Sequence, residues 1–360
     1  MKYFEISLLC ILSVLTFSCR SKDDTVFFKG ELVHISITSC TDTLKGSLVT
    51  LEDECLGLIS VYDSLIIFSH AMDKKYQYHC YNYETGRHLA NFFPIGRGSG
   101  EFMNVTPIHC TFNCGDTVKS IFVAVDEQKI GVFNMSQSVL NKRTMLESIS
   151  NFEWRERFIN PVTQVYPLGD KIIGYINGRK PYFENDNYIL PHCMVFDKTT
   201  MNVVDTIELY NKALLNELGE GIDINVFSFF NALKPDGTQM ASIMVYLPQI
   251  NIWDIKSGKI KGIRFGPTTL VDLMDRSRQA TLCHAFLEVD EDYIYAPWFV
   301  NGEFDKGTHL INVFSWEGNH IAQYYIEEPF DQIRIEPKSN TLFAYNQFTN
   351  KLYRYKMPAK

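Results

Sequence analysis

His109, Cys110 and Cys114 bring three soft metal ligands together within six residues. Zinc sites in proteins use four ligands, or three and a water, and a second cluster normally supplies the rest. No Cys-x-x-Cys or similar partner cluster occurs elsewhere in the sequence. We therefore expect His109 and Cys110 to lie in a strand and to hold no metal, and we predict no resident cofactor.

Calcium is the one ion that the sequence leaves open. Some proteins with a central channel hold Ca²⁺ there with Glu, Asn and Asp oxygens. Five residues follow apolar stretches at positions where they could face such a channel: Asp126, Asn177, Asn231, Asn301 and Asn346. Asn also ends strands for reasons of turn geometry alone. The sequence does not decide between these two roles.

The most distinctive local sequence is the glycine-rich segment Phe93–Phe102. Glycines at every second position indicate backbone with positive φ or very close packing. The spacing matches neither the dinucleotide-binding nor the Walker pattern, and no helix is expected to follow, so this is not a phosphate loop. Arg97, Glu101 and Phe102 are candidate ligand-binding residues at a channel mouth. Alternatively, Arg97 and Glu101 pair with each other or with neighbouring blades to hold the loop.

The motifs of familiar hydrolases are missing from the sequence. It contains no Gly-x-Ser-x-Gly nucleophile elbow, no His-Glu-x-x-His zinc helix and no sialidase-type Asp turn. Glycosidase chemistry needs two carboxylates at a set separation, and dispersed acidic residues cannot be paired from sequence. No catalytic residue can be assigned, and an enzyme is the less favoured class.

One repeated unit accounts for the length of the chain. An alternating strand, a polar turn and a second strand recur about every 40–60 residues, anchored by the aromatic residues Tyr81, Phe133, Phe196, Trp253, Phe314 and Tyr353. Each copy reads as a β-hairpin with two further strands upstream, as in Leu56–Phe93. Six such units predict an all-β, six-bladed propeller with four-stranded blades. A solenoid is the alternative, although it requires caps and more uniform repeats.

The last unit stops after its third strand, near Met357. An N-terminal strand must therefore close the last blade, and the alternating segment Val26–Ile37 is the predicted one. The propeller domain is predicted over residues 26–360.

Long connections between blades are predicted to gather on one face, which makes this rim the candidate binding face. Glu147–Phe158 contains Trp154 and Arg155, two candidate ligand-binding residues. Asn211–Gly221 and Thr268–Thr281 have apolar residues at helical spacing and predict short helices. We expect their leucines to plug the channel mouth: Leu214, Leu218 and Leu273. The turns of the outer hairpins are expected to be short.

The N-terminus has the layout of a signal peptide over residues 1–18, with an apolar stretch that ends at Cys19. Leu15–Cys19 resembles a loose bacterial lipobox, which predicts lipidation of Cys19 and a tether over residues 19–25. The acidic run Ser21–Asp24 resembles the export signal of surface lipoproteins in Gram-negative gut anaerobes. The predicted location is the outer membrane, exposed at the cell surface or facing the periplasm. The alternative for the N-terminal segment is a plain secretory signal without lipidation. The alternative for Ser21–Asp24 is a solvated tether that carries no export signal.

The net charge of −8 argues against nucleic acid as a partner. The nine cysteines have no regular spacing, and those within apolar runs are expected to be buried thiols rather than disulfides.

The segment ending in Glu101-Phe102 resembles the glycine-rich loop of the TolB-like six-bladed propeller lipoproteins, although Ser99 stands where that family usually has Pro. The resemblance implies the propeller fold and a lipid anchor and carries little about activity, because members are largely uncharacterised. The favoured hypothesis is a lipid-anchored, non-catalytic binding module for a protein, peptide or glycan. The alternatives are a propeller lactonase, lyase or hydrolase with a channel site, and a structural partner in an envelope complex.

Overall fold

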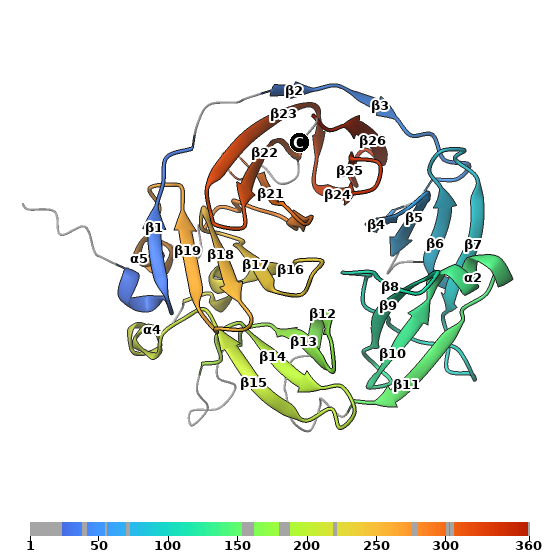
Figure 1. The fold of residues 1–360 in the computed structure, drawn as a ribbon, viewed down its shortest axis with the longest axis horizontal. Coiled ribbons are helices and arrows are strands. Elements are labelled where there is room, and N and C mark those ends of the chain that lie inside the picture. Colours follow the sequence, from blue (N-terminus) through green and yellow to red (C-terminus); the bar gives the residue numbers. More distant parts are fainter. Residues whose placement is uncertain are drawn as a thin grey trace, which may run out of the picture.

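The structure is a computed structural model of the 360-residue chain. It describes residues 24–37, 42–54, 56–69, 73–152, 162–179, 188–218, 222–275, 280–299, 302 and 306–358. Six β-sheets are arranged as blades around a central axis, which confirms the six-bladed propeller (Figure 1).

Each blade contributes four consecutive strands, except the last, and the chain runs from the innermost strand outward. Blade 1 is formed by β4 (Leu58–Tyr62), β5 (Leu65–Ser69), β6 (Tyr76–Asn82) and β7 (His88–Pro94). Blade 2 is formed by β8 (Phe112–Cys114), β9 (Thr117–Ala124), β10 (Lys129–Asn134) and β11 (Leu146–Asn151). Blade 3 is formed by β12 (Val162–Leu168), β13 (Lys171–Ile176), β14 (His192–Asp197) and β15 (Val203–Glu208). Blade 4 is formed by β16 (Phe229–Leu233), β17 (Gln239–Met244), β18 (Gln249–Asp254) and β19 (Ile260–Arg264). Blade 5 is formed by β20 (Glu288–Val289), β21 (Tyr293–Trp298), β22 (Thr308–Ser315) and β23 (His320–Phe330). Blade 6 contains β24 (Gln332–Glu336), β25 (Thr341–Asn346) and β26 (Lys351–Lys356).

An N-terminal strand closes the ring, as predicted, but it is a different strand. β3 (Gly46–Leu48) pairs antiparallel with β26 and completes blade 6. The predicted segment Val26–Ile37 instead contains β1 (Glu31–His34), which adds a parallel fifth strand to blade 4 by pairing with β19. β2 (Asp42–Leu44) pairs in parallel with β23 of blade 5. The chain thus follows the outside of the ring across two blades before it reaches the open one (Figure 1).

Apolar residues that alternate along the strands fill the interfaces between adjacent blades. Between blades 1 and 2, the Phe93 ring lies 5.0 Å from the Phe122 ring and 4.9 Å from the Phe133 ring. All three side chains are at most 1% exposed. Burial of such rings stabilises each interface by about 25 cal/mol for each Å² removed from water. Comparable apolar clusters occur at the other five interfaces of the described chain.

The described helices are short. They are the 3₁₀ helices η1 (Thr25–Phe27) and η2 (Ile224–Phe227) and the α-helices α2 (Met135–Asn141), α4 (Lys212–Glu217) and α5 (Leu270–Asp275).

The helices α4 and α5 confirm the two predicted helical inserts, but they do not plug the channel. Both lie at the outer side of the ring beside β1 (Figure 1). Leu214 and Leu273 are 0% and 4% exposed within the cluster between blades 3 and 4, and Leu218 packs against that cluster.

The outer hairpin of blade 2 also differs from the expected short turn. Helix α2 begins directly after β10, where the Asn134 side chain accepts a hydrogen bond from the backbone N–H of Gln137. This N-cap satisfies one of the free N–H groups at the start of a helix, so the chain turns through a helix before β11.

The described part of the chain begins at Asp24, inside the predicted tether 19–25. The Asp24 side chain is buried and forms an ion pair with Arg264, whose guanidinium is also buried. Residues 1–23, including Cys19, lie outside the described residues, so the signal peptide and lipidation stay predictions. No helix in the described part of the chain has the length and apolar character needed to cross a membrane.

Candidate functional site

The glycine-rich loop after β7 is held together by its own residues. The Glu101 carboxylate accepts a hydrogen bond from the backbone N–H of Gly98 at 2.8 Å, and it packs so closely on Gly96 that a Cβ there would overlap it. The Phe102 ring is 3% exposed and packs on Phe93 and Phe122. Glu101 and Phe102 therefore have clear structural roles.

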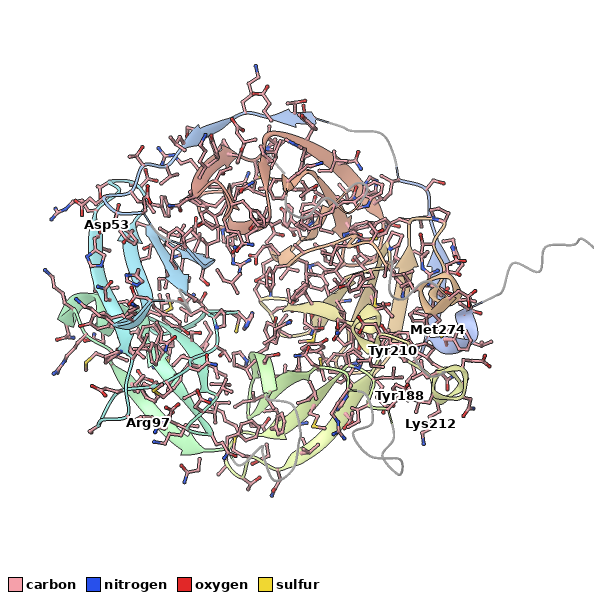
Figure 2. All side chains as sticks on the ribbon, turned by 180° about the vertical axis from the view of Figure 1, so that it is seen from behind. Asp53, Arg97, Tyr188, Tyr210, Lys212 and Met274 are labelled. Atoms are coloured by element: carbon pink, nitrogen blue, oxygen red, sulfur yellow. The ribbon has the colours of Figure 1, made fainter. Side chains whose placement is uncertain are left out.

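Arg97 is exposed on the same loop and has no hydrogen bond or ion pair with any described residue. Figure 2 shows Arg97 at the outer edge of the ring, away from its centre. The structure thus places it far from a channel mouth. Trp154 and Arg155, the other two candidates on the inter-blade rim, lie outside the described residues, and their binding role stays a prediction.

A cavity of about 340 Å³ lies in the central channel. The innermost strands of all six blades, or the residues beside them, contribute to its wall. Its polar lining residues include Tyr62, His109, Tyr166, Glu288, Arg334 and Lys338. Tyr62 and Lys338 adjoin the turns between the first and second strands of their blades, so the cavity reaches the face opposite the inter-blade rim. The candidate site therefore lies at the other end of the channel from the predicted one.

Arg334 on β24 is the strongest charged feature of this cavity. Its Nη1 donates to the backbone carbonyl of Ile333 at 2.7 Å and lies 3.1 Å from Oε1 of Glu288 on β20. The guanidinium lies 5.9 Å from the centre of the Phe286 ring. Its Nε and Nη2 have no hydrogen-bond partner among the described residues. One edge of a largely buried guanidinium, with two N–H donors, thus has no partner among the described residues and lies beside a cavity.

A bulge brings His109 and Cys110 into the same cavity, which corrects the prediction that they lie in a strand. The backbone N–H of Thr106 donates to the carbonyl of Val123, and Phe112 pairs with Lys119. Between these two contacts the segment that leads into β8 advances by six residues, from 106 to 112, while its partner β9 spans only four, from 123 to 119. The two extra residues form the bulge. Extra residues of this kind are common beside functional sites, because they redirect side chains.

Neighbouring blades hold the bulge in place. Ser60 Oγ of blade 1 donates to the Ile108 carbonyl at 2.9 Å, and Ser120 Oγ of blade 2 donates to the Cys110 carbonyl at 2.9 Å. Cys110 Sγ lies 3.8 Å from the carbonyl oxygen of Val165 in blade 3. The bulge is therefore a fixed part of the channel wall.

A second bulge shapes the wall at β12. The pairing of β12 with β13 shifts between Thr163 and Tyr166, and Gln164 adopts a positive φ of 49°. The Tyr166 hydroxyl donates to the Asn231 carbonyl on β16, and the Asn231 N–H donates to Gln164 Oε1 at 3.0 Å. This link between blades 3 and 4 fixes the Tyr166 ring at the cavity.

The protonation states in the cavity favour binding over nucleophilic or base chemistry. Burial, with a smaller contribution from the nearby positive charge of Arg334, lowers the pKa of His109 to about 3. Burial raises the pKa of the Cys110 thiol to about 12. Near neutral pH, Cys110 is therefore a thiol rather than a thiolate nucleophile, and His109 is a weak base. Burial also raises the pKa of Glu288, against the lowering influence of Arg334.

Metal ligation gains no support from the described residues. No group of three or more His, Cys, Asp or Glu side chains among them is arranged to hold a metal ion. Of the residues proposed for calcium, Asn231 Oδ1 accepts from Ser242 Oγ at 2.7 Å. Asn346 Oδ1 accepts from two backbone N–H groups of the following turn. Asn301 lies outside the described residues, and the calcium hypothesis stays a prediction.

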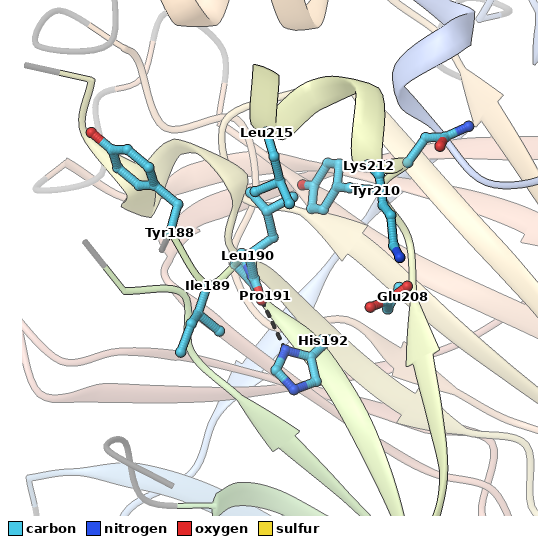
Figure 3. Close-up of a pocket in the computed structure, with 10 residues that line it drawn as sticks. Tyr188, Ile189, Leu190, Pro191, His192, Glu208, Tyr210, Lys212 and Leu215 are labelled. Atoms are coloured by element: carbon cyan, nitrogen blue, oxygen red, sulfur yellow. Dashed lines mark hydrogen bonds between the residues drawn. The ribbon is translucent and has the colours of Figure 1, made fainter. Parts of the chain in front are cut away.

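A second cavity of about 180 Å³ lies at the inter-blade rim, between the segment leading into β14 and helix α4 (Figure 3). Tyr188, Leu190 and Leu215 form its apolar wall, and Glu208 and Lys212 add charges of opposite sign. The rim predicted as the binding face thus has a cavity, although the residues that line this cavity include no buried ion pair.

Sequence reasoning missed Arg334 and Glu288. The available signal for Arg334 was its place between Ile333 and Ile335 in a predicted inner strand, because a charged residue between buried apolar neighbours must face the channel or a partner. His109 and Cys110 were singled out from the sequence, but the bulge that presents them was not predicted.

Comparisons with known proteins are consistent with this architecture. No family model and no curated protein matches the sequence. Among solved structures, a Bacteroides fragilis protein described as exported is 13% identical, with a TM-score of 0.53 over 91% of this chain and 99% of its own. A member of the DUF4221 family from Bacteroides vulgatus is 11% identical, with a TM-score of 0.59 over 88% of this chain and 97% of its own.

Raptor from Chaetomium thermophilum is also similar, at 11% identity and a TM-score of 0.50, over 88% of this chain and 29% of its own. The chain has the six-bladed propeller fold. At these identities the comparisons show the fold alone, and the resemblance to TolB-like lipoproteins stays a prediction.

Proposed function

We propose that this protein is a lipid-anchored binding propeller of the cell envelope, and that its central cavity takes up a small molecule with a carboxylate group. The observation that carries the proposal is the Nε–Nη2 edge of Arg334, whose two N–H donors have no partner among the described residues. A guanidinium binds carboxylates through two parallel hydrogen bonds. Glu288 occupies one nitrogen and fixes the orientation of the group, which leaves Nε and Nη2 for the ligand.

The volume and lining of the cavity support a small ligand rather than a protein segment. A cavity of about 340 Å³ lies at the lower end of the range for small-molecule sites. Tyr62 and Tyr166 add aromatic surface with polar tips to its wall. A binding role is favoured over a lactonase, lyase or hydrolase, because neither His109 nor Cys110 has the pKa of an effective base or nucleophile.

Ligand binding should be coupled to proton uptake at Glu288. Burial already raises the pKa of this carboxyl. A ligand carboxylate nearby would raise it further, because like charges disfavour the ionised form. Binding should therefore take up protons and strengthen as the pH falls towards the pKa of Glu288.

Calorimetric titration with defined carboxylates tests the proposal. The probes are glucuronate, glutarate and succinate, with glucose, glutaramide and succinamide as the counterparts that carry no carboxylate. We expect at least one carboxylate to bind and its uncharged counterpart to bind more weakly. Arg334→Met should weaken binding by roughly 10- to 100-fold, the equivalent of about 1.5–3 kcal/mol for hydrogen bonds to a charged group. Arg97→Met, an arginine on the outer edge, should leave the affinity unchanged.

Two outcomes would refute the channel site. The first is that none of the three carboxylates binds. The second is that Arg334→Met binds as tightly as the unmodified protein.

The anchor and the envelope location rest on the N-terminal sequence. Residues 1–18 support export, and Cys19 supports lipidation. Because the Asp24 side chain is buried, only Ser21–Asp23 is left for the export signal, and the charges of Lys22 and Asp23 in it cancel. Cys19→Ala should release the protein from membranes. Protease added to intact cells should degrade the protein if it is displayed at the surface.

A protein, peptide or glycan partner at the inter-blade rim is the second candidate. The cavity between Tyr188 and Leu215 favours it, because an apolar wall beside opposite charges suits an amphipathic partner.

A further inference from the structure

Asp24, the first described residue, is locked into the outer side of the propeller. The Asp24 carboxylate is 3% exposed, and its Oδ2 lies 3.3 Å from Nη2 of Arg264, which is 1% exposed. The same oxygen accepts the backbone N–H of Leu270 at the start of α5. Because both charges are buried, separating them would leave an uncompensated charge in the interior. Asp24 is therefore a fixed point and not part of a loose tether.

The residues that follow Asp24 are pinned as firmly. Phe28 pairs with Tyr210 in an antiparallel bridge. The Lys29 N–H donates to the Leu209 carbonyl at 2.8 Å, and the Asn211 N–H donates to the Phe27 carbonyl at 2.6 Å. These bonds hold η1 against the chain between β15 and α4. Figure 1 shows η1, α4 and α5 together at one edge of the ring, beside β1.

We infer that this edge, formed by η1, α4 and α5, faces the membrane surface, and that the propeller stands on it. The inference rests on the lipid anchor at Cys19 proposed above. Cys19 and Asp24 are five residue steps apart, and a fully extended chain spans at most about 3.6 Å per residue. Asp24 therefore stays within about 18 Å of the lipidated residue. An anchor this short does not let the ring turn its opposite edge towards the bilayer.

The side chains on the edge fit a lipid headgroup region without deep insertion. Val26 is 56% exposed and Leu215 is 37% exposed. Charges of both signs accompany them, including an ion pair between Lys29 and Glu208. The short tether, and not a basic patch, therefore holds this edge of the propeller near the bilayer. Because the ring axis runs along the view of Figure 1, an edge-on ring leaves both ends of the channel open to ligand.

Site-specific labelling of anchored protein tests the inference. Val26→Cys reports the proposed membrane edge, and Leu140→Cys on α2, which is 75% exposed, reports the opposite side of the ring. Each lipidated variant is reconstituted into phosphatidylethanolamine–phosphatidylglycerol vesicles and treated with a bulky, membrane-impermeant maleimide. Labelling of each introduced cysteine is quantified by mass spectrometry, separately from the native cysteines. The same variant with Cys19→Ala, mixed with the same vesicles, supplies the reference rate.

Anchoring should slow labelling several-fold at Val26→Cys and leave the rate at Leu140→Cys unchanged. A flexible Gly-Ser linker of 20 residues between Asp23 and Asp24 spans about 25 Å on average, and should restore the rate at Val26→Cys while the protein stays on the vesicles. Equal rates at Val26→Cys with and without the anchor would overturn the edge-on orientation alone. Unmodified protein that does not fractionate with membranes would overturn the anchor and the orientation together.

Discussion

The buried pair of Asp24 and Arg264 offers a stringent test of how firmly the start of the described chain is held in the fold. Asp24→Ala removes the only carboxylate that lies in ion-pair distance of Arg264 among the described residues. Arg264 would keep its hydrogen bonds to Gln249 Oε1 at 2.8 Å and to the Thr268 carbonyl at 3.1 Å. Its charge, however, would be unpaired at 1% exposure, and the N–H of Leu270 would lose its acceptor.

The expected cost follows from these contacts. Breaking a buried ion pair by removing one partner costs about 3–5 kcal/mol. We take about 3 kcal/mol, the lower end, because the guanidinium keeps two of its hydrogen bonds. With an m-value of about 3 kcal/mol/M in urea, the unfolding midpoint should fall by about 1 M. Urea unfolding followed by tryptophan fluorescence measures this shift.

Asp23→Ala is the matched control, because it removes the same carboxyl group one residue earlier, in the proposed tether. Its effect should stay within about 0.5 kcal/mol, as for an ordinary surface substitution. Asp24→Asn, which keeps an acceptor oxygen and loses the charge, should fall between the two alanine variants. The reasoning fails if Asp24→Ala and Asp23→Ala unfold at the same urea concentration.

Three further predictions concern the closing strand, the channel wall and the glycine-rich loop. Gly46→Ala places a Cβ against the ring of Tyr355 and should cost about 1–3 kcal/mol by overpacking blade 6; a urea midpoint equal to that of the unmodified protein would show that β3 does not close the ring as described. Folding lowers the pKa of His109 from 6.5 to about 3, so the unfolded chain binds more protons between these pH values and stability falls as the pH falls through that window. His109→Gln should reduce this acid sensitivity in urea unfolding measured from pH 7 to pH 4, and an unchanged pH profile would contradict burial of the imidazole. Phe102→Ala should cost about 3–5 kcal/mol because a buried ring is lost, and Arg97→Ala less than about 0.5 kcal/mol; similar losses for both would contradict the assigned packing.

The fold was predictable because the hairpin repeat is local. Each hairpin specifies its own blade through alternation and turn residues, and the number of units then determines the closed ring. The closing strand was predicted wrongly for a non-local reason. Leu32–Ile35 alternates more regularly than Gly46–Leu48, but closure depends on which segment reaches the open edge of blade 6 and fits beneath Tyr355. The helix after β10 had a readable signal in its N-cap, Asn134.

The candidate site was less predictable, because it depends on contacts between blades. Arg334 and Glu288 come from different blades, and the sequence alone does not show that their side chains meet. His109 stood out by residue type, but its place in the channel follows from a bulge that has no clear sequence signature. The glycine-rich loop stood out by its sequence, and the contacts of Glu101 and Phe102 agree with the alternative that the sequence left open, a role in packing the loop.

A crystal structure of the propeller with its tightest-binding carboxylate tests the central claim most directly. The account predicts a ligand carboxylate in the central cavity, with its two oxygens at about 2.7–2.9 Å from Nε and Nη2 of Arg334. The Glu288 carboxylate should remain on Nη1. Electron density for the ligand at the inter-blade rim, with the channel cavity unchanged, would contradict the account.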